Sequence, residues 1–308
     1  MQGKIRRLRV ISAAVAMSIV GTGALASCGL ARPSQARIGI APVALGADTV
    51  SFASRSGSTI HAWFARGESG AGAVLLLHGV GDDRRAMTER ARFLHRAGYS
   101  VLLPDFQGHG ESAGAHITFG ALESLDAVAA LDYLHVHAPG ERTGVIGVSM
   151  GGAAALVGPS GPLRADALVL ESVYPTINDA VRDRLRAWLG PIGPAFTSSV
   201  LSVVGRQIGV APDVLRPLDR IGTVSAPVLI AAGTKDRYTP INETRALYAN
   251  APSPKELWVV DGAGHVDLHA FAPLEYERRI GSFLSRNLRS VRGVHAATQL
   301  APATRTAG

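Results

Sequence analysis

The hydrophobic residues between about positions 48 and 290 gather in short runs that alternate with stretches of helical spacing. Six runs have the length of a strand and are apolar almost throughout: 73–77, 100–103, 143–148, 167–170, 228–232 and 257–260. Such runs are typical of strands that are buried on both faces of a parallel sheet. Between them, apolar residues recur three or four positions apart, as at Met87, Ala91 and Leu94. The alternation predicts an α/β domain over 48–290, with a mostly parallel sheet, helices on both of its faces and an opening hairpin at 49–65.

One segment interrupts this alternation. No strand is expected between about 173 and 224, where the periodicity predicts helices at 177–189 and 196–208. Two Gly-Pro pairs, at 190–191 and 193–194, separate these helices. We therefore expect an insertion of two or three helices that forms a small cap beside the sheet.

The first 27 residues have the layout of an export signal. Four basic residues precede an uncharged, apolar run over 10–26: Lys4, Arg6, Arg7 and Arg9. A run of 17 residues that contains serine, threonine and glycine is marginal as a membrane span, because a span needs about 20 predominantly apolar residues. The pattern predicts a signal peptide over 1–27.

The end of this run bears on where the protein resides. Leu25, Ala26, Ser27 and Cys28 resemble the lipobox of bacterial lipoproteins. The resemblance implies that Cys28 is lipidated and becomes the mature N-terminus, which would anchor an exported protein to the membrane of the bacterial cell envelope. The alternatives are an ordinary secretory signal and an uncleaved anchor. After Cys28 we expect a tether over 28–47, and after the domain a flexible tail over 291–308.

Composition and charge narrow the classes of protein. Cys28 is the single cysteine of the 308 residues, so the chain can form neither an internal disulfide nor a cysteine-rich zinc site. The formal charge of +7 falls to +3 without residues 1–27, since 27 basic and 24 acidic residues remain. The basic residues are scattered and lack interleaved aromatic residues, so we expect no nucleic-acid partner.

A candidate nucleophile lies between a strand and a helix. The pattern Gly-x-Ser-x-Gly occurs around Ser149 and again around Ser112. Ser149 directly follows the run 143–148 and precedes a stretch of small residues at 151–155, which is the strand, turn and helix of a nucleophile elbow. Ser112 lies in a polar loop and is interpreted as a turn residue.

A base and an acid should follow in the order serine, acid, histidine. Asp236 follows the run 228–232, and His265 follows the run 257–260. Both positions belong to the carboxyl edge of the expected sheet, where α/β folds place their sites. Glu171, at the end of an earlier strand, remains an alternative acid, and His269 an alternative base.

Acyl transfer also needs two donors for the oxyanion. The backbone N–H of Met150 is one candidate, and the N–H of Val80, after the strand 73–77, is the other. His78, in the same turn, is interpreted as a structural hydrogen-bonding residue. The sequence contains no metal-binding motif, so we expect no metal, and it contains no phosphate-binding glycine loop.

These residues resemble the α/β-hydrolase superfamily over about 50–290. The resemblance is carried by His78-Gly79-Val80, the loop from Asp105 to Ser112, the elbow around Ser149, Asp236 ahead of Pro240, and Gly264-His265. Within the superfamily the pattern is similar to the serine aminopeptidase and monoacylglycerol-lipase-like branch. The resemblance implies a triad of Ser149, Asp236 and His265, an oxyanion hole at Val80 and Met150, and no cofactor.

The sequence thus predicts a serine hydrolase that cleaves carboxylic esters, lipid esters among them, through an acyl-enzyme. An aminopeptidase or a thioesterase is the alternative within enzymes, and an aminopeptidase would need an acidic group for the substrate amine, for which Glu171 and Asp179 are candidates. A lipoprotein that binds a lipid or another ligand without catalysis is the alternative from a different class. The oligomeric state is not predicted.

Overall fold

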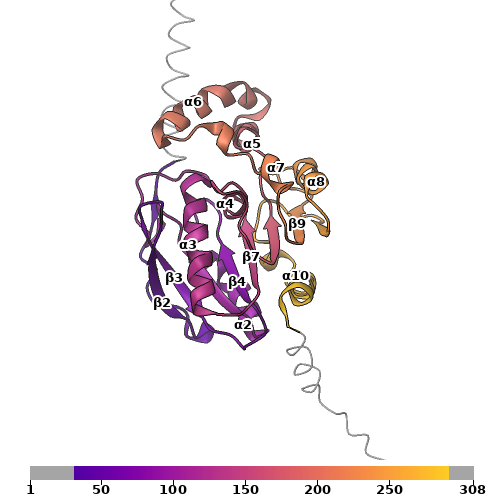
Figure 1. The fold of residues 1–308 in the computed structure, drawn as a ribbon. Helices are drawn as coiled ribbons and strands as arrows, with labels where there is room; N and C mark the ends of the chain where they lie inside the picture. Colours follow the sequence, from indigo (N-terminus) through magenta and orange to yellow (C-terminus); the bar gives the residue numbers. More distant parts are fainter. Residues whose placement is uncertain (1–30, 291–308) are drawn as a thin grey trace, which may run out of the picture.

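The structure of the protein is a computed structural model, of which residues 31–290 are described. Its centre is an eight-stranded sheet of order β10-β9-β8-β7-β4-β5-β3-β2 (Figure 1). The strands are β2 (Asp48–Ala53), β3 (Thr59–Ala65), β4 (Ala73–Leu77), β5 (Ser100–Pro104), β7 (Thr143–Val148), β8 (Ala167–Glu171), β9 (Val228–Gly233) and β10 (Lys255–Val260). The six strands from β10 to β5 in this order are parallel, and β3 and β2 form an antiparallel hairpin at one edge. The predicted α/β architecture and its opening hairpin are confirmed.

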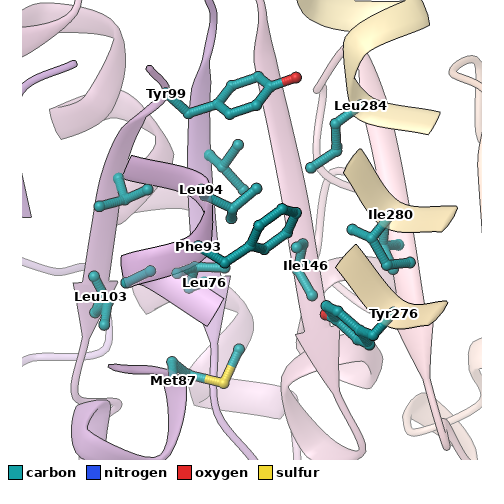
Figure 2. Close-up of a cluster of buried hydrophobic side chains, with 14 of the residues drawn as sticks. Leu76, Met87, Phe93, Leu94, Tyr99, Leu103, Ile146, Tyr276, Ile280 and Leu284 are labelled. Carbon is teal, nitrogen blue, oxygen red and sulfur yellow. The ribbon is translucent and has the colours of Figure 1, made fainter. Parts of the chain in front are cut away.

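Helices cover both faces of the sheet because alternate residues of its central strands point to opposite sides. Val74 and Leu76 of β4 belong to a core shared with α2 (Thr88–Arg96) and α10 (Pro273–Leu288). Figure 2 shows part of this core, where Tyr276, Ile280 and Leu284 of α10 lie across from Phe93 and Leu94 of α2.

The opposite face carries a different set of helices. Ala73, Leu75 and Leu77 of β4 contribute to a core with α3 (Ala121–His137) and α4 (Met150–Leu156). Near the other edge of the sheet, α8 (Ile241–Asn250) adds Leu247 to a third core, which also includes residues of β8 and β9. These cores fix the loops at the carboxyl ends of the strands.

The stretch between β8 and β9 contains the expected insertion. It consists of α5 (Ile177–Leu189), the 3-10 helix η3 (Gly190–Phe196), α6 (Thr197–Ile208), η4 (Pro212–Val214) and α7 (Pro217–Ile221). The helices α5 and α6 lie beyond one end of the strands (Figure 1). By length and composition 177–208 could cross a membrane, but the stretch is broken at η3 and its inner residues share a core with β8 and β9.

The segment 31–47 differs from the expected tether. Its strand β1 (Ser34–Gln35) pairs with β6 (His109–Gly110), η1 (Val43–Leu45) follows, and Ala31 and Leu45 are buried. Glu111 accepts hydrogen bonds from the backbone N–H groups of Ile38 and Gly39, at 3.0 Å each. The docking combines a few buried side chains, such as Leu45, with hydrogen bonds to distant side chains, and neither leaves a periodic pattern in the sequence. Residues 1–30, with the predicted signal and Cys28, and the predicted tail at 291–308 lie outside the described residues.

Candidate active site

Ser149 occupies a strained turn between β7 and α4. Its backbone has φ 51° and ψ −113°, a conformation that residues other than glycine seldom adopt. Two glycines make the turn sterically feasible: a Cβ on Gly147 would lie 2.6 Å from Gly152 Cα, and a Cβ on Gly151 would lie 2.4 Å from the Leu77 carbonyl oxygen. Strain of this kind is held by the surrounding structure and is common where a side chain must be presented to a substrate.

His265 and Asp236 come together from the loops after β10 and β9. The Nδ1 atom of His265 lies 2.8 Å from Asp236 Oδ2. The other carboxylate oxygen, Oδ1, accepts the backbone N–H groups of Tyr238 and Thr239, at 2.8 Å each. The Asp236 side chain is fully buried. These contacts fix the carboxylate so that it accepts a hydrogen bond from Nδ1–H of His265. The proton of the neutral imidazole then lies on Nδ1, which leaves Nε2 as the basic nitrogen.

The loops that carry Ser149 and His265 line one cavity of about 460 Å³. Its lining includes Ser149 and His265 together with Val80, which lies in the loop after β4. No hydrogen bond joins the Ser149 hydroxyl to His265 in residues 31–290, and hydrogen bonds of this kind are often loose before a substrate binds. In the same part of the chain the backbone N–H groups of Val80 and Met150 have no hydrogen-bond partner, so both can serve an incoming acceptor.

Glu171, the alternative acid, belongs to a different network. Its carboxylate is bound by Arg90, at 2.7 Å from Nη2, and accepts a hydrogen bond from the Tyr276 hydroxyl at 2.5 Å. Arg90 also pairs with Asp267, at 2.9 Å. Glu171 is 1% exposed, and no contact joins it to His265 among the described residues. The network ties β8 to α2 and α10 and leaves the orientation of His265 to Asp236.

Three other polar residues have structural contacts. Ser112 donates to the Asp105 carbonyl oxygen at 2.8 Å and accepts the His61 N–H at 2.9 Å. His269, the alternative base, contacts Glu277 at 3.2 Å. His78 is buried, and this burial, with the neighbouring His109, lowers its pKa to about 3, so its imidazole stays neutral and bonds to the adjacent backbone.

The cap supplies a residue that the sequence analysis did not assign to the site. Arg184 of α5 lines the large cavity and also a smaller one of about 80 Å³ beneath the cap. The smaller cavity is otherwise almost entirely apolar, with Met150, Tyr174 and Leu201 among its lining residues. The sequence does contain an indication of this position. Arg184 lies seven residues after Ile177, which places a charged residue on the apolar face of the helix.

No metal site accompanies these residues. Within 31–290 no group of three or more His, Cys, Asp or Glu side chains is arranged to hold a metal ion.

Comparisons with known proteins agree with this architecture. Residues 68–208 match the family described as serine aminopeptidase, S33. An uncharacterized protein of Mycobacterium tuberculosis is 31% identical over 217 residues, which cover 69% of this chain and 70% of the relative. The uncharacterized protein YfhR of Salmonella typhi is 28% identical over 249 residues, which cover 73% and 77%.

Among solved structures, the esterase Pf2001 of Pyrococcus furiosus superposes with a TM-score of 0.69. It is 25% identical in sequence, and the match covers 83% of this chain and all of the esterase. The esterase EaEST of Exiguobacterium antarcticum, 17% identical with a TM-score of 0.59 and coverage of 77% and 99%, shares the fold. The chain belongs to the α/β-hydrolase superfamily, and it is a hydrolase.

Proposed function

We propose that the protein is a serine hydrolase that cleaves carboxylic esters through an acyl-enzyme intermediate. One observation carries the proposal: a serine in a strained turn and a histidine bound to a buried aspartate line the same cavity. A turn of this shape holds the serine backbone in a conformation that costs free energy, and residues held in this way cluster at sites where a side chain is presented to a substrate.

The proposed reaction has two halves. In the first, His265 Nε2 takes the proton of the Ser149 hydroxyl while Oγ attacks the ester carbonyl, and the N–H groups of Val80 and Met150 bind the resulting oxyanion. The carbonyl re-forms, the C–O bond to the alcohol breaks, and His265 returns the proton to the leaving alcohol. In the second half a water molecule repeats the attack on the acyl-enzyme, with His265 as base, and releases the acid and the free serine. Asp236 stays ionised and stabilises the imidazolium.

The test is the replacement of the nucleophile. We expect Ser149→Ala to abolish hydrolysis of p-nitrophenyl butyrate and labelling by a fluorophosphonate probe. Ser172→Ala is the matched control, because Ser172 lines the same cavity at φ 49° and its buried hydroxyl has no hydrogen-bond partner in the described residues. Hydrolysis retained by purified Ser149→Ala would refute the assignment. Absence of labelling in the wild-type protein would instead favour a non-catalytic, ligand-binding lipoprotein.

The alternative of an aminopeptidase needs an acid for the substrate amine. Glu171 is neutralised by Arg90, and Asp179 pairs with Arg182 at 2.6 Å, and neither lines the cavity. Of the acids that do line it, Asp267 pairs with Arg90 at 2.9 Å and Asp82 is exposed to water at the rim. These contacts favour esters or thioesters over aminoacyl amides. A panel of p-nitrophenyl esters, thioesters and aminoacyl p-nitroanilides measures the preference directly.

We further propose that the protein is exported and held at the membrane of the cell envelope by lipid on Cys28. The proposal rests on the apolar run and on the residues 25–28 that end it. Two or more acyl chains would anchor the protein stably, where one chain gives marginal binding. In a bacterial host we expect Cys28→Ser to move the protein out of the membrane fraction. A variant that stays firmly in that fraction with its signal cleaved would contradict lipidation.

A further inference from the structure

The cap places a cation beside the candidate nucleophile. Arg184 of α5 lines both cavities that Ser149 lines, at the point where the larger cavity meets the apolar one. Val181 and Leu185, its neighbours on the same face of the helix, are buried in the core beneath the cap. A charged side chain on such a face is rare unless it has a partner of opposite charge.

The chain itself provides no such partner in residues 31–290. No carboxylate oxygen lies within 4 Å of the guanidinium; Nη1 donates to the Ala180 carbonyl oxygen at 3.2 Å, and the group lies over the Tyr238 ring, 5.3 Å from its centroid. Two acids are nearby, Asp236 and Asp183. The oxygens of Asp236 already bind His265 and two backbone N–H groups, and Asp183 pairs with Arg182 at 2.9 Å. Burial lowers the pKa of the Arg184 guanidinium, which nevertheless stays charged at neutral pH. Arg184 is partly buried, and a cation that has lost part of its water without gaining an anion costs free energy that a bound anion would recover.

The other charged residues that line the cavity are not free to bind an anionic ligand. Arg90 is neutralised by Glu171 and by Asp267. Asp82, at the rim, is exposed to water, which weakens its effect on a ligand. In the described part of the chain, Arg184 is therefore the cation that an anionic ligand in this cavity would meet.

We propose that Arg184 binds an anionic group, a carboxylate or a phosphate, of the ester substrate while the apolar cavity beneath the cap holds an uncharged part of the same molecule. This inference rests on the proposed ester hydrolysis and specifies its substrate class: esters that carry a negative charge on the side of the cap. The planar guanidinium suits both anions, since it offers paired donors to two oxygens. The same charge repels a substrate with a free amine.

The experiment compares substrates that differ in this charge alone. The first pair is mono-p-nitrophenyl glutarate and p-nitrophenyl valerate, which both have a five-carbon acyl chain and differ in the terminal carboxylate. The second pair is 1-butyrylglycerol 3-phosphate and 1-butyrylglycerol, which differ in the phosphate. For each pair we expect the wild-type protein to have a higher kcat/KM for the anionic ester, and the pair with the larger ratio identifies the anion. Arg184→Met should lower that ratio on the order of 10- to 100-fold, chiefly through KM, and Arg184→Lys should restore part of it.

Arg186→Met is the matched control. Arg186 lies two residues further along α5, is 60% exposed and lines neither cavity. We expect it to keep the wild-type ratio. A ratio near one in the wild-type protein, or a ratio that Arg184→Met leaves unchanged, overturns the inference while neutral esters are still hydrolysed. Failure to hydrolyse any of the four esters overturns the proposed function itself.

Discussion

Replacement of Asp236 by asparagine is the sharpest test of how the candidate site holds its histidine. The Oδ1 atom of Asp236 accepts two backbone N–H groups, from Tyr238 and Thr239. An asparagine must keep its oxygen toward these two donors, so its amide nitrogen faces His265 Nδ1. Two donors cannot face each other, and the imidazole is forced into the tautomer with its proton on Nε2. In that state Nε2 cannot accept the proton of Ser149.

Loss of the correct tautomer in serine hydrolases lowers kcat by about 10⁴, equivalent to about 5 kcal/mol of transition-state stabilisation. We expect Asp236→Asn to lose between about 10³- and 10⁴-fold in kcat on p-nitrophenyl butyrate, with its thermal unfolding close to that of the wild type. The control is Glu171→Gln, which weakens the pairing of Arg90 and should lower the Tm while kcat of the folded protein changes less than about threefold. If Asp236→Asn keeps a tenth of the wild-type kcat, or Glu171→Gln loses as much, Asp236 does not orient the base.

Two further predictions concern stability. Burial, with the neighbouring Asp183, raises the pKa of Glu243 from 4.5 to about 9. Between these pH values the folded protein keeps a proton on Glu243 that the unfolded chain loses. The free energy of unfolding therefore falls as pH rises between about 5 and 9, by up to about 1.4 kcal/mol per pH unit. Glu243→Gln removes this dependence. We therefore expect the Tm of the variant minus the Tm of the wild type to be larger at pH 8.5 than at pH 5.5. The same difference at both pH values would show that Glu243 is ionised in the folded protein. Gly151→Ala should destabilise by about 1–3 kcal/mol in urea unfolding and abolish activity, because its Cβ would lie 2.4 Å from the Leu77 oxygen. The control Gly222→Ala, whose nearest neighbour would be at 3.5 Å, should change stability little; equal losses in both variants would contradict the steric argument.

The fold was predictable because its strands are buried on both faces and therefore read as continuous apolar runs. The expected run 143–148 and the strand β7 (Thr143–Val148) coincide. The positions of Ser149, Asp236 and His265 at strand ends followed from these runs, because the carboxyl ends of parallel strands share one edge. The choice between Asp236 and Glu171 as the partner of His265 could not be predicted. It depends on the contact of Arg90 with Glu171, and these two residues are 81 positions apart, so no local pattern indicates it.

Arg184 and the segment 31–47 escaped the prediction for different reasons. Arg184 has the helical spacing of a core residue, and its place at the cavity depends on how the cap packs over the sheet. The segment 31–47 contains little regular structure, and its position depends on Glu111, far along the chain.

The docking of this first segment has a geometric consequence for the proposed anchoring. Ala31 is buried, and the hydroxyl of Ser34 donates to the carbonyl oxygen of Gly81 at 2.9 Å, directly after Val80 at the cavity. Two residues lie between Cys28 and Ala31, and even a fully extended chain spans these three Cα–Cα steps in only about 11 Å. With so short a connection to the lipid, the domain could not move away from the bilayer. The face that carries the mouth of the cavity would stay close to the lipid headgroups. Encounter with substrate would then become a search in two dimensions, in which esters arrive by lateral diffusion within the membrane.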